Sequence, residues 1–260
     1  MRFDLESTGN GGKAMIFVIT GGSRGIGAEI VAQAVAAGHS VAFTYNTNEA
    51  AAQRIVEHAR SIHADAACKA YPLDVRDSAA VDAFADSVLR DFGTVDVVVS
   101  NAGVNRNALL MSMSDEEWSD VLEVNLTGAF HVARAFVPAM LEKRFGRFVF
   151  LSSLSRDGLS GQANYAATKA GLLGLSRTIA KEYGKRGITS NVVAPGMIDT
   201  DMSRENMSDV HGRFWEAHST LRRVGSAAEV ASAVMFFAQP EAAYINGTCL
   251  PVTSALDWVP

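Results

Sequence analysis

Residues 15–27 read MIFVITGGSRGIG, in which an apolar run, Met15–Thr20, passes into a glycine-rich turn and then into a helical pattern, Ile26–Ala37. Glycines here let the backbone turn tightly and let a pyrophosphate approach the N-terminus of the helix. The free N–H groups and the dipole of that helix end stabilise negative charge. The alternative is an ordinary strand-to-helix turn with incidental glycines. The strand–turn–helix context favours dinucleotide binding by Gly21, Ser23, Arg24, Gly25, Ile26 and Gly27.

Short apolar runs alternate with longer helical patterns along the rest of the chain. Runs such as RFVFL at 147–151 are apolar almost throughout, which is typical of strands covered by helices on both faces. Strands are predicted at Met15–Thr20, Ser40–Tyr45, Ala67–Pro72, Val95–Ser100, Arg147–Ser152, Thr189–Ala194 and Cys249–Val252. Helices are predicted at Ile26–Ala37, Glu49–Ile62, Ser78–Phe92, Asp115–Lys143, Gln162–Arg186 and Ala227–Ala238.

Repeated strand–helix–strand units imply right-handed crossovers and one parallel sheet. The pattern therefore predicts an α/β protein with a Rossmann-like, doubly wound, seven-stranded parallel sheet in a single domain, residues 15–260. Residues 1–14 are expected to form a flexible leader. Residues 196–224 are the least regular segment, and a stretch of that length inside a compact domain usually serves as a lid or binding loop.

Composition limits the classes of function. The chain has 260 residues, 23 Lys and Arg and 28 Asp and Glu, hence a net charge of −5 without a charged block, which argues against a general affinity for nucleic acid or anionic membranes. Cys68 and Cys249 form neither a disulfide framework nor a metal-like spacing. No apolar run approaches the ~20 residues of a membrane span, and the N-terminus lacks the apolar region of a signal peptide. We expect a cytoplasmic protein without a metal.

The end of the second predicted strand indicates which nicotinamide cofactor is used. An acidic residue there would bind the ribose hydroxyls of NAD and repel a 2′-phosphate. Here Tyr45 and Asn46 occupy these positions, and no acid occurs before Glu49. Arg24 in the glycine turn can pair with a 2′-phosphate through charge-assisted hydrogen bonds, although it could instead be a solvated surface cation. The sequence therefore favours NADPH.

Tyr165 and Lys169 occur at an i, i+4 spacing in a helical pattern, which puts both side chains on one face, one turn apart. A tyrosine with a pKa near ~10 exchanges protons poorly at neutral pH. A nearby ammonium and a cationic oxidised nicotinamide would lower that pKa and make the tyrosine a usable acid. The alternative is an incidental pair on a helix surface.

These motifs together resemble the short-chain dehydrogenase/reductase family. The glycine turn, Asn101-Ala102-Gly103, Asn125, Ser152-Ser153, Tyr165 with Lys169, and Pro195-Gly196 recur in that family's order across about residues 15–248. Residues 101–130 and 161–174 are similar to the 3-oxoacyl-[acyl-carrier-protein] reductases in particular. The resemblance implies a seven-stranded parallel sheet and a homotetramer.

The resemblance also implies roles. Tyr165 would donate the proton to the carbonyl oxygen, Lys169 would hold the nicotinamide ribose, and Asn125 would hold a water that links Lys169 to solvent. A serine would hydrogen-bond the substrate oxygen. Asn101, Ala102 and Gly103 would line the adenosine ribose side, Asp74 and Val75 would lie at the adenine, and Pro195, Gly196, Ile198 and Thr200 would lie at the nicotinamide and diphosphate. Asp74 could instead be an acid of a helix N-cap region.

Two departures from the family pattern matter. The loop between the serine and Tyr165 is one residue short, so that counting back from Tyr165 gives Ser152, whereas counting along the strand from Gly146 gives Ser153. We favour Ser153, because strand register fixes the direction of a side chain while loops absorb deletions. The C-terminal stretch 245–260 also departs from the family, which puts the geometry of the tetramer in doubt.

The resemblance implies NADPH-dependent reduction of a 3-oxoacyl thioester on acyl-carrier protein, in fatty acid or polyketide-type synthesis. Alternatives are reduction of another ketone, such as acetoacetyl-CoA, a sugar, a steroid or a cyclic ketone, or a catalytically idle binding or regulatory subunit. Arg144 and Arg186 end two predicted helices and match the arginines that contact the carrier in the carrier-protein reductases. The alternative is that the helix dipole alone favours cations at these C-termini.

Overall fold

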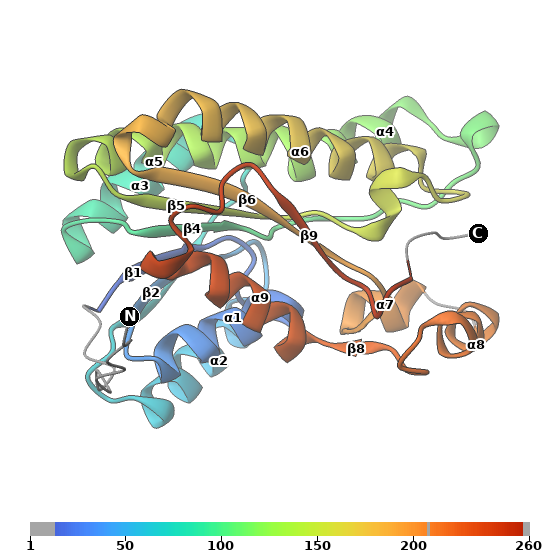
Figure 1. The fold of residues 1–260 in the computed structure, drawn as a ribbon, viewed down its shortest axis with the longest axis horizontal. Helices are drawn as coiled ribbons and strands as arrows, with labels where there is room; N and C mark the ends of the chain where they lie inside the picture. Colours follow the sequence, from blue (N-terminus) through green and yellow to red (C-terminus); the bar gives the residue numbers. More distant parts are fainter. Residues whose placement is uncertain (1–13, 207–208, 257–260) are drawn as a thin grey trace, which may run out of the picture.

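The computed structural model describes residues 14–206 and 209–256, which form a doubly wound parallel sheet with helices on both faces (Figure 1). The sheet has seven parallel strands in the order β3-β2-β1-β4-β5-β6-β9. The strands are β1 (Ile16–Ile19), β2 (Ser40–Tyr45), β3 (Cys68–Pro72), β4 (Val97–Ser100), β5 (Gly146–Leu151), β6 (Ile188–Pro195) and β9 (Cys249–Val252). The predicted fold class is therefore confirmed, and the predicted strands differ from these bounds by two residues at most.

Two hydrophobic clusters hold the helices against the two faces of the sheet. Strand β1 shows why its residues are apolar throughout, because Phe17 and Ile19 belong to one cluster and Val18 to the other. Burying one such side chain contributes about 1.5–3 kcal/mol. The first cluster covers α1 (Gly25–Ala36), α2 (Glu49–Ile62) and α9 (Ala227–Ala238). The second covers α3 (Ser78–Phe92), α5 (Gly128–Lys143) and α6 (Ala163–Tyr183).

The region predicted as one helix, Asp115–Lys143, is interrupted. Helix α4 (Asp115–Leu122) begins with a capping box between Ser114 and Glu117, and a π-helical turn, η2 (Glu123–Thr127), joins it to α5. Short 3₁₀ turns lie at other points of the chain: η1 (Leu110–Ser112), η3 (Leu154–Asp157), η4 (Gly184–Arg186) and η5 (Pro240–Ala242). Because a π turn adds a residue without changing the apolar face greatly, periodicity alone predicts an unbroken helix.

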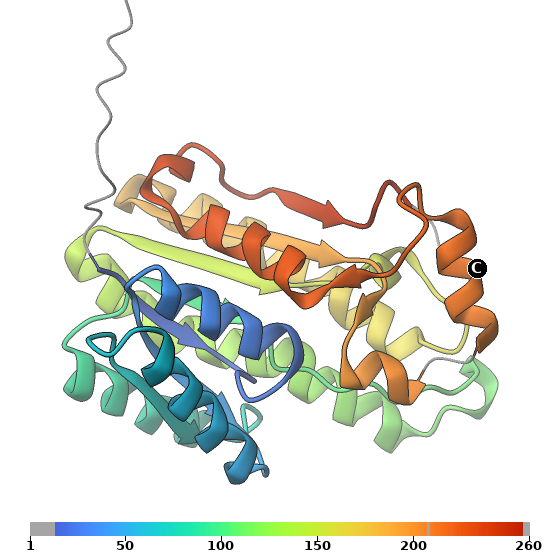
Figure 2. The same ribbon diagram turned by 90° about the horizontal axis from the view of Figure 1, so that it is seen from below.

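The segment expected to be a lid contains regular structure. Strand β7 (Ile198–Asp199) pairs in parallel with β8 (Gly225–Ser226), and between them lie α7 (Asp201–Asn206) and α8 (Asp209–His218). Figure 2 shows α7 and α8 beside the ends toward which the arrows of the sheet point. The pairing of β7 with β8 therefore brings together the two ends of the segment that contains α7 and α8. This segment lies beside the carboxyl ends of the central strands.

Part of the predicted leader, residues 1–13, lies outside the described residues, as do 257–260 of the tail. Within the described residues, no helix is long and apolar enough to cross a membrane.

Candidate active site

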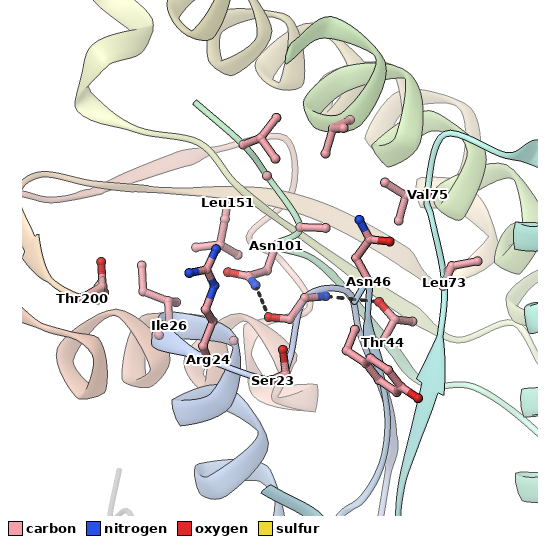
Figure 3. Close-up of a pocket in the computed structure, with 18 of the residues that line it drawn as sticks. Ser23, Arg24, Ile26, Thr44, Asn46, Leu73, Val75, Asn101, Leu151 and Thr200 are labelled. Atoms are coloured by element: carbon pink, nitrogen blue, oxygen red, sulfur yellow. Dashed lines mark hydrogen bonds between the residues drawn. The ribbon is translucent and has the colours of Figure 1, made fainter. Parts of the chain in front are cut away.

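A pocket of about 520 Å³ opens at the carboxyl ends of the parallel strands (Figure 3). It contains most of the predicted site residues, although they come from distant parts of the sequence. These are Gly21, Ser23, Arg24, Gly25, Ile26, Gly27, Tyr45, Asn46, Asp74, Val75, Asn101, Ala102, Gly103, Tyr165, Lys169, Pro195 and Thr200. Ser152 also lines it, whereas Ser153, Asn125, Gly196 and Ile198 lie outside its lining.

The glycine turn forms a cradle at the N-terminus of α1. Gly25 has φ +56°, in the left-handed region that favours glycine. A Cβ on Gly27 would lie 2.2 Å from the Gly21 carbonyl oxygen and 2.6 Å from Nδ2 of Asn101. Arg24 precedes the helix, and its side chain does not cap the first turn. A helix end without a side-chain cap leaves N–H groups available for a diphosphate, so the cradle fits a dinucleotide.

Asn101 fastens strand β4 to the glycine turn. Its Nδ2 donates to the carbonyl oxygens of Thr20 at 2.9 Å and Gly21 at 3.0 Å. The Thr20 hydroxyl in turn accepts from the main-chain N–H groups of Asn101 and Ala102, both at 3.0 Å. The Asn101 side chain therefore fixes the conformation of the glycine turn. It also lines the pocket, as predicted.

The end of β2 carries no acid toward the pocket. Thr44, which the sequence reasoning did not select, accepts a hydrogen bond from the Gly21 N–H at 3.2 Å and so fixes the start of the glycine turn. Figure 3 shows Ser23, Arg24 and Asn46 on the walls of the same pocket. One cation, Arg24, and several neutral polar groups thus lie around the pocket at the end of β2. Such an arrangement can bind an anionic group such as a phosphate.

A chain of ion pairs crosses the end of the pocket at which the resemblance places adenine. Arg76 contacts Asp74 at 2.6 Å and Asp120 at 3.2 Å, and Arg106 contacts Asp120 at 3.2 Å. The hydrogen bond from Arg76 is the main cause that lowers the pKa of Asp74. Asp74 lines the pocket as predicted, but its carboxylate is already engaged. Sequence reasoning missed Arg76, Arg106 and Asp120, because only the fold brings these three segments together.

Tyr165 and Lys169 share one face of α6 beside the end of β5, as predicted. The Lys169 Nζ lies 5.3 Å from the centroid of the Tyr165 ring and donates to the Leu151 carbonyl oxygen at 2.7 Å. The Lys169 residue is only 4% exposed, and burial lowers its pKa to about 8. Burial raises the pKa of Tyr165 to about 12, an effect that its hydrogen bond with Ser153 opposes.

The two candidate serines have different partners. The Ser152 hydroxyl is buried and donates to the Lys169 carbonyl oxygen at 2.7 Å. The Ser153 hydroxyl is hydrogen-bonded to the Tyr165 side chain and also accepts from the Ser155 N–H at 3.1 Å, which caps the turn η3. Because a main-chain donor occupies one lone pair of the Ser153 oxygen, its own proton remains available to a second acceptor.

Asn125 lies within the π-helical turn and is 2% exposed. Its Oδ1 accepts from the Val104 N–H at 2.8 Å, and its Nδ2 donates to the Val104 carbonyl oxygen at 2.9 Å. The side chain therefore holds the loop after β4 through both of its polar atoms. A water linked to Lys169 would then be held more readily by a main-chain carbonyl of the π turn, because such turns displace the regular helical hydrogen bonds.

Asn164, next to Tyr165, is a positioning residue that sequence reasoning missed. Its fully buried Nδ2 donates to the main-chain carbonyls of Arg106 and Glu117, both at 3.0 Å. Its Oδ1 accepts from the Tyr165 N–H at 2.7 Å. The start of α6 is thereby tied to α4 and to the loop after β4. The signal that could have found it was a polar residue at a buried helix start, where unsatisfied groups are costly.

The residues after β6 divide into two groups. Pro195 and Thr200 line the pocket, whereas a Cβ on Gly196 would face Thr253 and the Trp215 ring. Ile198 is buried, and its side chain lies against Gly225 of β8. The predicted contacts of Gly196 and Ile198 with a cofactor would therefore have to come from the main chain.

The two docking candidates lie far from this pocket. Arg144 follows α5 and lies two residues before the start of β5, and Arg186 ends η4 two residues before the start of β6. Both are therefore at the amino ends of the strands, whereas the pocket is at the carboxyl ends. Arg186 lines a separate, shallow groove with Pro138, Leu141, Glu142, Glu182 and Tyr183.

Comparison with known proteins agrees with this fold. A model of the family described as enoyl-(acyl carrier protein) reductase matches residues 21–254. The 3-oxoacyl-[acyl-carrier-protein] reductase FabG of Escherichia coli (strain K12) is 44% identical over 242 residues, which are 93% of this chain and 96% of that protein. The 3-oxoacyl-[acyl-carrier-protein] reductase MabA of Mycobacterium tuberculosis (strain ATCC 25618 / H37Rv) is 42% identical over 243 residues, 92% of this chain and 91% of that protein.

A solved structure of levodione reductase superposes with a TM-score of 0.90 at 28% identity, covering 94% of this chain and 97% of that one. A doubly wound sheet with a glycine cradle and a serine, a tyrosine and a lysine at its carboxyl edge defines a nucleotide-dependent oxidoreductase. The chain belongs to the short-chain dehydrogenase/reductase family and is an enzyme that uses a nicotinamide cofactor.

Proposed function

We propose that the enzyme reduces the 3-oxo group of an acyl thioester carried on acyl-carrier protein to the 3-hydroxyl, with NADPH. The observation that carries the proposal is the placement of Tyr165 in the pocket, with the buried Lys169 one helical turn away on α6 and the Ser153 side chain close enough to lower the pKa of Tyr165. Two hydroxyl groups that converge on one point suit a carbonyl oxygen that gains charge. The names of two relatives at 42–44% identity supply the substrate class.

When bound, NADPH supplies the hydride that goes to the carbonyl carbon at C3. Tyr165 donates its proton to the carbonyl oxygen, so that one hydride and one proton together give the hydroxyl group. Ser153 donates a hydrogen bond to the same oxygen and stabilises the charge that develops there. Lys169 is positively charged below pH about 8 and favours the tyrosinate that remains.

Tyr165 must be reprotonated after each turnover. We propose that the proton comes through Lys169 and through water at the π turn that contains Asn125. The support for this route is that Asn125 fixes the loop beside Lys169, while a Cβ on Gly103 would lie 3.7 Å from the Lys169 Nζ. There is thus little room for a bulky group between the lysine and this loop.

NADPH is proposed over NADH because Arg24 is the cation at the mouth of the cradle and no acid ends β2. Its guanidinium would pair with the 2′-phosphate, and Ser23, Tyr45, Asn46, Asp74, Val75, Asn101, Ala102, Gly103, Pro195 and Thr200 would bind the rest of the cofactor. We further propose a cytoplasmic homotetramer, as the family resemblance implies.

Two other functions deserve a test. Reduction of a different ketone would use the same residues and differ only in the surroundings of the substrate. Enoyl reduction, which the description of the family model names, would deliver hydride to a carbon–carbon double bond. The pair of converging hydroxyls favours carbonyl reduction, and an idle binding subunit would not need that pair.

The deciding experiment is NADPH oxidation against matched substrates. A panel should contain 3-oxoacyl and 2-enoyl chains of equal length, each on acyl-carrier protein and on coenzyme A, with a cyclic ketone. The proposal expects the highest kcat/KM with the 3-oxoacyl carrier substrate. A higher value with an enoyl chain, or with the cyclic ketone, would replace it.

A further inference from the structure

After β9 the chain forms a turn at residues 253–256, here called the C-terminal turn, which contacts the segment that follows helix α8 (Figure 2). The main-chain N–H and the hydroxyl of Thr220 both donate to the Ser254 carbonyl oxygen, at 3.0 and 2.9 Å. The Leu221 N–H donates to the Ser254 Oγ at 2.8 Å. Ser254 therefore accepts three hydrogen bonds from residues that lie just after α8.

The backbone at this contact is strained. Arg222, Ser254 and Ala255 have φ of +55°, +53° and +57°, in the left-handed region that favours glycine. Within residues 14–206 and 209–256 the only other non-glycine residue with a positive φ is Arg144. Glycine at position 254 would relieve the strain, but it would lack the oxygen that accepts from Leu221. Such strain persists only where surrounding contacts fix it, and it gathers at sites where the position of a group matters.

Leu256 anchors the C-terminal turn beside the turn η3. It is 4% exposed and forms a hydrophobic cluster with Leu154 and Trp215, apart from the two clusters that cover the sheet. Trp215 belongs to α8, and Leu154 directly follows Ser153. A Cβ on Gly196, which follows β6, would lie 3.4 Å from the Trp215 ring. The cluster therefore joins α8, η3 and the C-terminal turn beside the end of β6.

The placement of Leu154 affects where the Ser153 hydroxyl lies. Ser153 caps η3, because its Oγ accepts from the Ser155 N–H at 3.1 Å. A displacement of Leu154 would turn this short helix and carry the capping oxygen with it. The Ser153 side chain has to stay beside Tyr165 if both hydroxyls are to meet one substrate oxygen. A misplacement of about 1 Å can lower a rate about 10²-fold.

We propose that Ser254 and Leu256 are positioning residues of the active site. Ser254 fixes the segment after α8, and Leu256 fixes Leu154 between α8 and the C-terminal turn. Ser153 is thereby held beside Tyr165. Neither Ser254 nor Leu256 lines the pocket that the described residues form, so neither has to touch the substrate. The inference rests on the proposed function for the role of Ser153, and it applies to whichever ketone the enzyme reduces.

The deciding test is a double-mutant cycle between Leu256 and Ser153. Leu256→Ala removes most of the side chain that holds Leu154, so kcat for a small carrier-free 3-oxo thioester should fall at least about tenfold. In an enzyme that already carries Ser153→Ala, the same change should lower the remaining kcat by less than about twofold, because the group that Leu256 positions is gone. Fluorescence titration should give a Kd for NADPH within about twofold of wild type throughout, because no cofactor contact is removed.

Two further variants separate a loss of position from a loss of stability. Leu256→Met restores nearly the same volume and should return kcat to within about twofold of wild type. Leu141→Ala removes a leucine that packs against the second cluster near the end of α5, at the amino edge of the sheet. It should lower the melting temperature and leave kcat unchanged.

Ser254→Ala and Ser254→Gly test the strained contact. Both lose the oxygen that accepts from Leu221, but only glycine also relieves the backbone strain. Arg222 and Arg223 are exposed just beyond this contact. In both variants trypsin should cut after these two arginines at least about threefold faster than in wild type, and kcat should fall. Mass spectrometry identifies the cleavage sites.

Several outcomes would overturn the inference. If Leu256→Ala lowers kcat equally with and without Ser153, Leu256 does not act through that serine. Unchanged kcat in Leu256→Ala, no recovery in Leu256→Met, or a Ser254→Gly enzyme as active as wild type would each show that the C-terminal turn does not position the site. Full kcat in Ser153→Ala alone is a different failure, because it removes the role of Ser153 from the proposed function and the inference with it.

Discussion

The Ser152 hydroxyl donates a hydrogen bond to the main-chain carbonyl of Lys169 at 2.7 Å, in the interior of helix α6. This contact ties the end of strand β5 to the helix that carries the tyrosine and the lysine, and it uses the one proton of the Ser152 hydroxyl. The neighbouring Ser153 instead meets the Tyr165 side chain. Ser152 therefore holds the two elements together, and we expect Ser153 to be the serine that acts on the substrate.

Separate alanine substitutions should distinguish these two serines. Ser153→Ala removes a donor aimed at the substrate oxygen, so kcat should fall about 10²–10³-fold while the melting temperature stays near that of wild type. Ser152→Ala removes one of the hydrogen bonds to the Lys169 carbonyl, which keeps its main-chain donor within α6, so it should lower stability by about 0.5–1.5 kcal/mol with a smaller loss of kcat. Steady-state kinetics and thermal unfolding measure both effects. The opposite pattern would make Ser152 the catalytic serine.

Tyr165→Phe removes a single hydroxyl group. The ring remains, so folding and NADPH binding should persist, whereas turnover should fall about 10²–10⁴-fold, the usual contribution of a positioned acid. Fluorescence titration of NADPH and the rate of its oxidation separate the two effects. Ala166→Ser, a polar change at the next position of α6, is a suitable control. Near-normal turnover in the phenylalanine variant would exclude Tyr165 as the acid.

The pH dependence of reduction should report Lys169. Burial sets its pKa at about 8, so the ammonium is present below that pH and is lost as the pH rises through it. The value of kcat/KM, which reports the free enzyme, should therefore be level near pH 6–7 and should decline about tenfold per pH unit well above 8. Initial rates at low substrate concentration measure this profile. A level profile up to pH 10 would show that the lysine charge is not needed.

Arg24 should determine the choice of cofactor. One charge-assisted hydrogen bond to the 2′-phosphate contributes ~1.5–3 kcal/mol, so NADPH should exceed NADH at least about tenfold in kcat/KM. Arg24→Ala should reduce this ratio, mainly by raising KM for NADPH, and should leave KM for NADH nearly unchanged. Equal use of both cofactors by the wild-type enzyme would contradict the assignment.

Gly27→Ala should weaken cofactor binding strongly without changing any polar group. Its methyl group would lie 2.2 Å from the Gly21 carbonyl oxygen and 2.6 Å from Nδ2 of Asn101, so the cradle must open. Fluorescence titration should show a large rise in Kd for NADPH, and circular dichroism should show that the helices persist. Unchanged Kd would mean that the turn has room that the structure does not show.

The sheet and most of the site could be predicted because they depend on local patterns. Apolar runs such as Phe148–Leu151 are buried on both faces and therefore read as strands from the sequence alone. The glycine turn, Tyr165 and Lys169 follow from spacing. The choice of Ser153 over Ser152 remains a prediction, which the contact with Tyr165 supports.

The rest required three-dimensional contacts. The ion pairs of Arg76 and Arg106 with Asp120 join three separate segments of the chain. No local sequence pattern predicts that these side chains meet. The position of Arg144 and Arg186 could have been foreseen. In a strand–helix–strand unit a helix ends where the next strand begins, so cations at helix C-termini always lie at the amino edge of a parallel sheet.

Helix α1 begins at Gly25 behind Arg24, a residue whose side chain leaves the first turn uncapped. The nucleotide therefore completes the secondary structure of the enzyme as well as its chemistry. A ligand that binds only the folded state stabilises it by about 2.7 kcal/mol at a hundredfold excess over Kd. We therefore expect the resistance of this protein to unfolding and proteolysis to rise and fall with the supply of its cofactor.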